Sequence, residues 1–238
     1  MVKSGLTRPE AGEPSTAKEI RVSPYRLATH LAMAFATFSL LVHTGLQALN
    51  GPAAAAAGAG GATVQSLGPA ALRHAKSLRA MSRGSFGLAF ATAMAGAFVA
   101  GNDAGRCYNC FPKMTEYAWV PEEIIDWEML PLWRNAFENS ATVQADHRLL
   151  ALSTLCAMAG MLGYARLRGG GALWAVLPAS SRGALTATAG MAGAQVTLGV
   201  ATLLQYVPLH LAAAHQAGAL GLLATSLWAT HSLRFAAA

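Results

Sequence analysis

Five long apolar runs constrain the fold of this chain more than any other feature of its sequence. A helix needs about 20 mostly apolar residues to cross a hydrocarbon core roughly 30 Å thick. Only 12% of the 238 residues are charged, whereas 54% are hydrophobic. The sequence therefore predicts an all-α fold, a polytopic transmembrane helix bundle with five spans, at residues 27–49, 84–101, 148–165, 183–204 and 209–230.

The charged residues between these runs predict an orientation. Segment 102–146 holds eight Asp or Glu against three Lys or Arg, whereas segments 50–83 and 166–182 hold Lys and Arg without any acid. Cationic loops mark the cytoplasmic or matrix side of a membrane. We therefore expect segment 102–146 outside and the C-terminus inside. The net charge of +6 is explained by this topology. No basic patch is interleaved with aromatic residues, so nucleic acid is not an expected partner.

The same reading divides the chain into four segments. Residues 1–26 have mixed charge and several prolines, which indicates an outer connector before the span at 27–49. Residues 50–83 form an inner loop that is first rich in Ala and Gly and then basic. Its part 71–83 is expected to be a short helix on the membrane surface, attracted by anionic lipid. Residues 84–238 form a four-helix unit with the outer loop 102–146.

Two histidines, His147 and His215, lie a few residues inside the third and fifth runs. An ionisable side chain in a span costs free energy unless it has a partner, so it marks a candidate functional site. The two runs cross in the same direction, which places both histidines at a similar depth near the outer side. Two neutral imidazoles at one level on different helices can hold a heme iron between them. Small neighbours such as Ala151 and Gly218 leave room for a flat ring.

Plainer interpretations of these residues remain open. His147 could bond to Asp146 while Arg148 extends to the headgroups, and His215 could form a hydrogen bond between helices. In the heme interpretation, Arg148 and Gln216 are candidate contacts of the ring or its propionates, since Arg pairs well with carboxylates. His30, at a similar depth in the first run, ranks above His43; either could also be a buried histidine bonded to a neighbouring helix.

The outer segment contains a CxxC pair, Cys107 and Cys110. The alternatives are a disulfide on an oxidising face, half of a zinc site, and a turn with two free thiols. Zinc needs four ligands, and the sequence has no second such pair and no histidine nearby, so no metal other than heme iron is expected. Gln195, in the fourth run, is expected to join two helices by hydrogen bonding.

Several stretches resemble heme A synthase, in the form found in mitochondria and related bacteria. They are GAFVAGNDAGRCYNCFPKM at 96–114, RNAFENSATVQADHRLLA at 134–151 and QVTLGVATLLQYVPLHLAAAHQAGAL at 195–220. The opening MVKSGL and the later RVSPYRLATHL at 21–31 are similar to the end of the third helix of that family and the start of its fourth. The resemblance covers nearly all of the chain except the Ala/Gly-rich stretch.

This resemblance implies an activity. The family has eight transmembrane helices in two related four-helix halves and oxidises the C8 methyl of heme O to a formyl group, giving heme A for cytochrome c oxidase. Successive hydroxylation gives a diol that loses water to form the aldehyde. His147 and His215 match the histidines of the second half, where heme b binds as cofactor. His30 matches a histidine of the first half, where the substrate heme is thought to bind.

The resemblance also implies that three helices of the first half are missing. With them would go the histidine partner of His30 and the acidic residue proposed to act in the oxidation, so the catalytic residue is expected in that part of the family's fold and not in this chain. Cys110 stands where the family often has another residue. We expect this chain to supply the heme-b half; the alternative is a non-catalytic heme-binding membrane subunit or assembly factor. Expected partners are heme O, membrane lipid, an electron donor such as ferredoxin, and a second copy of the chain. The expected location is the mitochondrial inner membrane, ahead of a bacterial plasma membrane.

Overall fold

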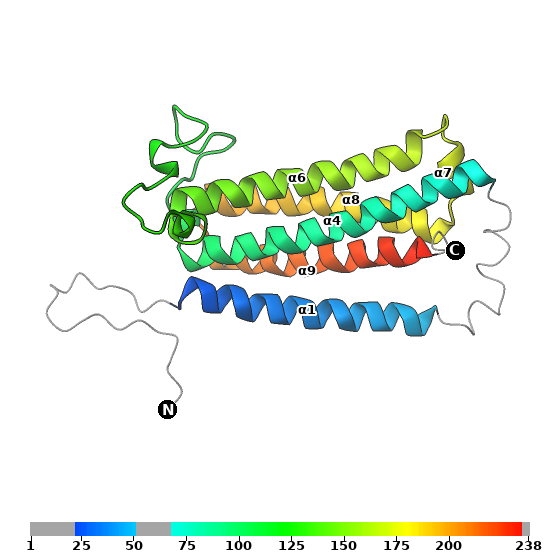
Figure 1. Cartoon of the computed structure of the whole chain (residues 1–238), viewed down its shortest axis with the longest axis horizontal. Coiled ribbons are helices and arrows are strands. Elements are labelled where there is room, and N and C mark those ends of the chain that lie inside the picture. The colour runs from blue at the N-terminus through cyan, green and yellow to red at the C-terminus, as the bar shows by residue number, and fades with distance from the viewer. Residues whose placement is uncertain (1–21, 51–67, 235–238) are drawn as a thin grey trace, which may run out of the picture.

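A computed structural model describes residues 22–50 and 68–234, and five long helices dominate this part of the chain (Figure 1). They are α1 (Pro24–Leu49), α4 (Pro69–Gly101), α6 (Ser140–Leu167), α8 (Ala179–Leu204) and α9 (Leu209–Ser232). The short elements are η1 (Ala104–Arg106), η2 (Glu122–Ile124), η3 (Leu132–Arg134), α5 (Asn135–Glu138) and α7 (Ala172–Val176). The predicted all-α bundle is confirmed. Most of the outer connector, and residues 51–67 of the Ala/Gly-rich stretch, lie outside the described residues.

The starts of the long helices follow from local sequence. Pro24 and Pro69 occupy the first turns of α1 and α4, where a missing backbone N–H removes no helical hydrogen bond. Pro178 and Pro208 stand at the N-cap positions of α8 and α9. Asn139 caps α6, because its side chain accepts a hydrogen bond from the backbone N–H of Ala141.

Four of the long helices, α1, α4, α6 and α8, are long and apolar enough to cross a membrane. Helix α9 has a similar length, but His210, His215 and Gln216 make its first turns more polar. Nevertheless α9 runs alongside the other four helices (Figure 1) and packs against α8, α4 and α1. Its polar residues therefore lie inside a bundle, which is where a membrane protein tolerates them.

Four helices form a closed ring in which α4 packs on α6, α6 on α8, α8 on α9 and α9 on α4. Helix α1 lies outside this ring and packs against α4 and α9 (Figure 1). The buried centre of the bundle includes Phe35 of α1, Met158 of α6 and Leu223 of α9. Helices α4, α6, α8 and α9 thus form a four-helix ring with α1 added at one side, and the division of the chain into segments at residue 84 stays a prediction.

Helix α4 differs from the sequence prediction at its start. A separate surface helix was expected at residues 71–83, but α4 runs unbroken for 33 residues from Pro69. Ala75, Leu78 and Ser82 are buried, and their spacing of three and four residues places them on one helix face. Leu78 packs in the same cluster as Leu185 of α8. The basic segment is therefore part of the bundle, because this apolar face is buried against its neighbours.

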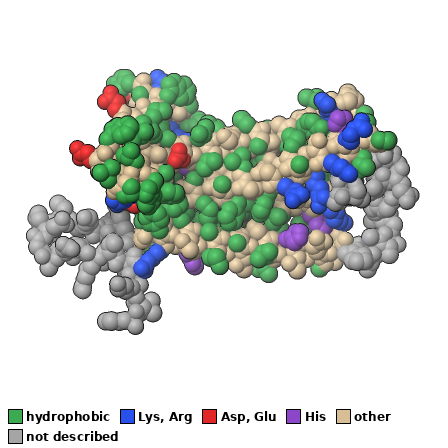
Figure 2. Space-filling view, in the orientation of Figure 1, with side chains coloured by type: hydrophobic (Ala, Val, Ile, Leu, Met, Phe, Trp, Pro, Cys, Tyr) green, Lys and Arg blue, Asp and Glu red, His purple; other side chains and the backbone are tan. Residues whose placement is uncertain are grey.

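The two ends of the bundle differ in charge. Figure 2 shows Asp and Glu gathered at one end, over residues 102–139, and most Lys and Arg at the other. We call these the loop end and the basic end. The segregation expected from the sequence is thus present in three dimensions. The assignment of the loop end to the outer side of a membrane stays a prediction.

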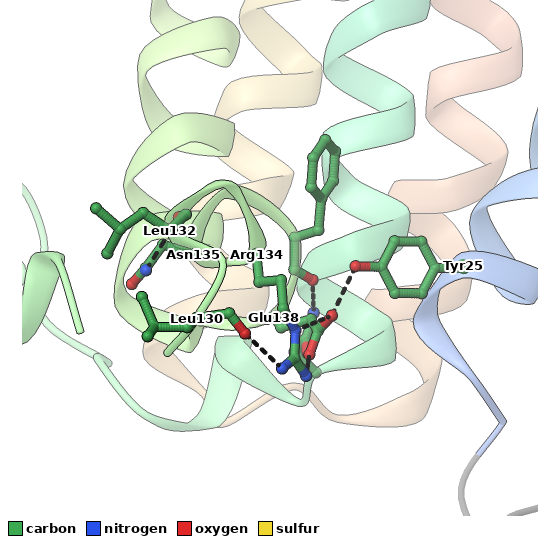
Figure 3. A network of polar contacts seen from close by, with 8 residues as sticks. Tyr25, Leu130, Leu132, Arg134, Asn135 and Glu138 are labelled. Carbon is green, nitrogen blue, oxygen red and sulfur yellow. Dashed lines mark hydrogen bonds and ion pairs between the residues drawn. The ribbon is translucent and has the colours of Figure 1, made fainter. Parts of the chain in front are cut away.

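A small polar network ties α1 to the loop end (Figure 3). Tyr25 donates a hydrogen bond of 2.7 Å to Oε1 of Glu138. Arg134 donates to the same carboxylate through Nε at 3.0 Å and through Nη2 to Oε2 at 2.5 Å. The hydrogen bonds from Arg134 and, to a lesser extent, from Tyr25 hold the pKa of the Glu138 carboxyl below its usual range. The network therefore joins the start of α1 to α5, which lies far from it in the sequence.

Candidate functional site

A cavity of about 510 Å³ opens within the bundle toward the loop end. All five long helices contribute to its lining, which is mostly apolar and includes Leu31 and Phe35 of α1. Sites for small molecules and cofactors have such apolar walls with a few polar groups placed among them. Both candidate ligands, His147 and His215, line this cavity. Each follows the start of its helix by six or seven residues, and α6 and α9 both start at the loop end (Figure 1).

His147 is oriented by the backbone of α4. Its Nδ1 lies 3.1 Å from the carbonyl oxygen of Thr92. A carbonyl can only accept a hydrogen bond, so Nδ1 carries the proton and Nε2 keeps a free lone pair. The ring also lies against Gly96, where an added Cβ would come within 3.0 Å of Cε1. The imidazole therefore packs directly on the α4 backbone, with the nitrogen suited to iron left available.

His215 occupies an equivalent place on the other side. Its ring lies against Gly199 of α8, where a Cβ would come within 2.9 Å of Cε1. The Nε2 of Gln195 donates a 2.6 Å hydrogen bond to the backbone oxygen of His215, which confirms the expected helix-joining role of this amide. The Nδ1 of His215 is buried and has no hydrogen-bond partner among the described residues. The two ligand positions are thus alike in packing and different in hydrogen bonding.

The similar surroundings of His147 and His215 have a common pattern in the sequence, which the sequence analysis did not recognise. Thr92 precedes Gly96 by four residues, and Gln195 precedes Gly199 by four, so each pair lies on one helix face beneath a histidine. Among the small residues, the sequence analysis singled out Ala151 and Gly218, and it did not select Gly96 or Gly199. Their role as a cradle for imidazole appears only when the helices are placed side by side.

The two candidate polar contacts, Arg148 and Gln216, also line the cavity. The guanidinium of Arg148 donates to the carbonyls of Tyr108 at 2.9 Å and Lys113 at 3.1 Å, and to Oε1 of Gln144 at 2.7 Å. Arg148 therefore fastens the loop over this end of the cavity. Arg106, which the sequence reasoning did not select, offers an exposed guanidinium at the same cavity.

Other predicted residues lie elsewhere. His30 is exposed on α1 and is not part of the cavity lining, where α1 contributes Leu27, Leu31 and Phe35 instead. The structure therefore does not bring His30 together with His147 and His215. Cys107 and Cys110 lie in the turn after α4 as free thiols, and a bond between them stays a prediction.

The residues present fit a bound heme in three respects. The cavity has apolar walls and two imidazoles at a similar distance from the loop end. The glycine at each imidazole allows its helix to approach closely. The Nδ1 of His215 has no hydrogen-bond partner among the described residues, so no contact at this nitrogen holds the ring away from a ligand in the cavity.

Comparison with known proteins decides the family. The family described as "Cytochrome oxidase assembly protein" (COX15-CtaA) matches residues 1–227. The chain belongs to this family. The chain is similar to "Heme A synthase COX15" of Arabidopsis thaliana, 46% identical over 98% of this chain and 46% of that protein. "Heme A synthase COX15" of Homo sapiens is 40% identical over 98% of this chain and 50% of that protein.

A third similar protein has a composite name. "Heme A synthase-mitochondrial ferredoxin fusion protein" of Schizosaccharomyces pombe is 37% identical over 95% of this chain and 37% of that protein. The chain spans about half the length of the curated relatives it matches. No solved structure matches it. Family membership and the helices together identify a multi-pass membrane protein.

Proposed function

We propose that this chain holds heme b between His147 and His215 and supplies the heme-b half of an enzyme that forms heme A from heme O. One observation carries the proposal: the two imidazoles line one cavity from separate helices, each six or seven residues after the start of its helix. The names of the curated relatives support the link to heme A. The reaction converts the C8 methyl of heme O to a formyl group.

The chain's own residues divide the work of binding. The carbonyl of Thr92 fixes the tautomer and orientation of His147, so that Nε2 is the nitrogen presented as ligand. Gln195 holds the backbone of His215 in place. Arg106 provides positive charge at the cavity for the propionate groups, while Gln216 lines the wall beside His215. Arg148 keeps the loop closed over this end, which limits access of water.

With His147 and His215 both as ligands, a heme iron would have no free site for oxygen, so the chemistry that the bound heme would supply is electron transfer. The substrate site is then a separate place. His30, exposed on the outer face of α1, is the residue of this chain that we assign to it. The acidic residue of the oxidation would belong to the first half.

Partners and location follow from the relatives. The Schizosaccharomyces pombe fusion favours a ferredoxin as the electron donor. The eukaryotic relatives favour the mitochondrial inner membrane as the location. We further propose that the protein contacts membrane lipid along the exposed side chains of its helices and forms homo-oligomers.

Expression in a host that makes heme O but lacks heme A synthase tests the proposal. Extracted pigments are separated by chromatography, and the purified chain is assayed for bound heme. We expect one protoheme per chain and no heme A from this chain alone. Coexpression with the first half of a full-length relative should then yield heme A. Formation of heme A by this chain alone would contradict the division of the enzyme into two halves.

The alternative is a non-catalytic heme-binding subunit or assembly factor. It is favoured by the finding that both cavity histidines belong to this chain, which therefore holds a complete ligand pair. In the coexpression experiment this alternative predicts bound protoheme without heme A. The two proposals thus differ in whether heme A is formed in the coexpression experiment.

A further inference from the structure

Four nitrogen-bearing side chains approach one another at the basic end, away from the heme cavity. They are His43 at the end of α1, Arg79 near the start of α4, and His231 and Arg234 at the end of α9. None of them lines the cavity, and the proposed function uses none of them. Figure 2 shows Lys, Arg and His side chains gathered at this end.

His231 is the buried member of the group. Its side chain is only 5% exposed, and its Nε2 has no hydrogen-bond partner among the described residues. The ring centroids of His231 and His43 are 6.5 Å apart, with planes at 82°. An unpaired buried ring nitrogen costs free energy, so a ligand that supplies its partner is stabilised there.

Arg234 and Arg79 lie at the same level of the bundle as His231. Arg234 donates to the backbone oxygen of His231 at 3.1 Å and to that of Asn50, just after α1, at 3.5 Å. The hydroxyls of Ser82 and Thr230 lie 2.9 Å apart and set the register of α4 against α9. These helices are antiparallel, so Arg79, one turn before Ser82, lies level with the end of α9. The Nε of Arg79 is also buried without a partner among the described residues.

No carboxylate balances these groups within the described part of the chain. Every Asp and Glu between residues 22 and 234 lies in the segment 103–146, at the loop end. Donors and positive charge that converge without an acid favour an anion, and Arg donors match the oxygens of phosphate.

The surroundings indicate which phosphate this is. The site lies at the end of the apolar helices, where a membrane boundary would fall. Leu40, Leu41 and Leu49 of α1 are 67%, 68% and 79% exposed and lie on the same part of that helix as His43. Exposed leucines beside a basic site suit acyl chains attached to a charged headgroup.

We propose that the basic end between α1, α4 and α9 binds the phosphate of an anionic phospholipid, with His231 Nε2, Arg79, Arg234 and His43 as donors. The lipid would join α1 to the ring at the end opposite the Tyr25–Glu138 contact. This site is independent of heme binding, so either proposal can fail without the other.

Thermal unfolding of the purified protein in detergent micelles tests the site, with or without bound heme. Phosphatidylglycerol, phosphatidylcholine or inorganic phosphate is titrated, and Tm is recorded. We expect phosphatidylglycerol to raise Tm where the other two do not. His43→Gln should weaken the apparent affinity about tenfold, the size expected for one charge-assisted hydrogen bond. Arg79→Gln combined with His231→Gln should abolish the shift.

Arg168→Gln is the matched control, because Arg168 lies over the Tyr164 ring on the far side of the basic end. This variant should keep the full response. An equal shift with phosphatidylcholine, or an equal loss in Arg168→Gln, would overturn the site. The same shift with inorganic phosphate alone would refute the lipid assignment. If the double variant does not fold, the exposed His43→Gln still decides the question.

Discussion

The two cavity histidines differ in what their Nδ1 atoms contact. His147 donates to the carbonyl of Thr92, whereas the Nδ1 of His215 has no partner among the described residues. A hydrogen bond at Nδ1 fixes the ring and increases electron donation from Nε2, and losing such a contact costs about 10- to 100-fold in metal affinity. His147 is therefore the stronger of the two proposed ligands.

This difference predicts unequal effects of removing each ligand. His215→Ala should retain most of its heme in a five-coordinate form that binds carbon monoxide when reduced. His147→Ala should lose most of its heme during purification. The heme-to-protein ratio and the carbon monoxide difference spectrum measure both effects. Equal heme retention in the two variants would show that the Thr92 contact does not strengthen the ligand.

The glycines under the two rings give a second prediction at this scale. Gly96→Ala and Gly199→Ala place a methyl group within about 3 Å of an imidazole carbon, so the ring or the helix must move. Both variants should bind heme more weakly. Gly87→Ala and Gly193→Ala are matched controls on the same helices, because nothing lies within 4 Å of a Cβ there. Heme titration measures the heme affinity of all four variants. Equal affinity in all four would show that Gly96 and Gly199 are not needed to seat the imidazoles.

At the scale of elements, α1 is the helix least integrated into the bundle. It packs on α4 and α9 only from outside the ring, and Tyr25 and Glu138 join its start to the loop end. The Arg134–Glu138 pair is partly exposed, with side chains 41% and 25% exposed, so water screens the attraction and the pair adds little to the stability of the fold. The network therefore fixes the position of α1 more than it stabilises the whole protein.

The contribution of the Tyr25–Glu138–Arg134 network to stability should depend on pH. The Glu138 carboxyl has a pKa below its ordinary value of 4.5, chiefly through hydrogen bonds from Arg134 and Tyr25. A depressed pKa contributes stability that is present above the unfolded-state value and is lost as pH falls through the folded-state value. In thermal unfolding, wild type should have a higher Tm than Glu138→Gln at neutral pH. This difference in Tm should vanish in acid. A difference that persists unchanged at low pH would contradict this role.

The elements also show where sequence reasoning stops. Apolar runs predicted the five long helices, and the matched depth of His147 and His215 predicted that both would line one site. The same reasoning was wrong about residues 71–83, because charge was weighted above the buried face made by Ala75 and Leu78. It missed the Thr92 carbonyl, since the rotation of a helix about its own axis is set by packing and not by hydropathy.

At the scale of the whole molecule, charge is divided between the two ends. Within the described residues all acids lie in segment 103–146, while Lys and Arg dominate the opposite end (Figure 2). Such a division orients a membrane protein with its basic end inside. We therefore expect the cavity that holds His147 and His215 to open toward the outer side, and the proposed lipid site to face the inner leaflet.

Cysteine labelling checks this orientation. Cys107 is exposed in the loop, so a protein with Cys110→Ser and Cys156→Ser carries one reactive thiol at that end. A membrane-impermeant maleimide should label it from the outer side of intact membranes. A matched protein in which Arg168→Cys supplies the only thiol should react only after permeabilisation. The reverse pattern would invert the topology.

The central claim is that two imidazoles, one from α6 and one from α9, hold a single heme. Electron paramagnetic resonance of the oxidised, purified protein measures this most directly. The account predicts a low-spin signal typical of two histidine ligands in wild type and its loss in both His147→Ala and His215→Ala, while the exposed His30→Ala leaves it unchanged. A low-spin signal that survives in either cavity variant would contradict the account.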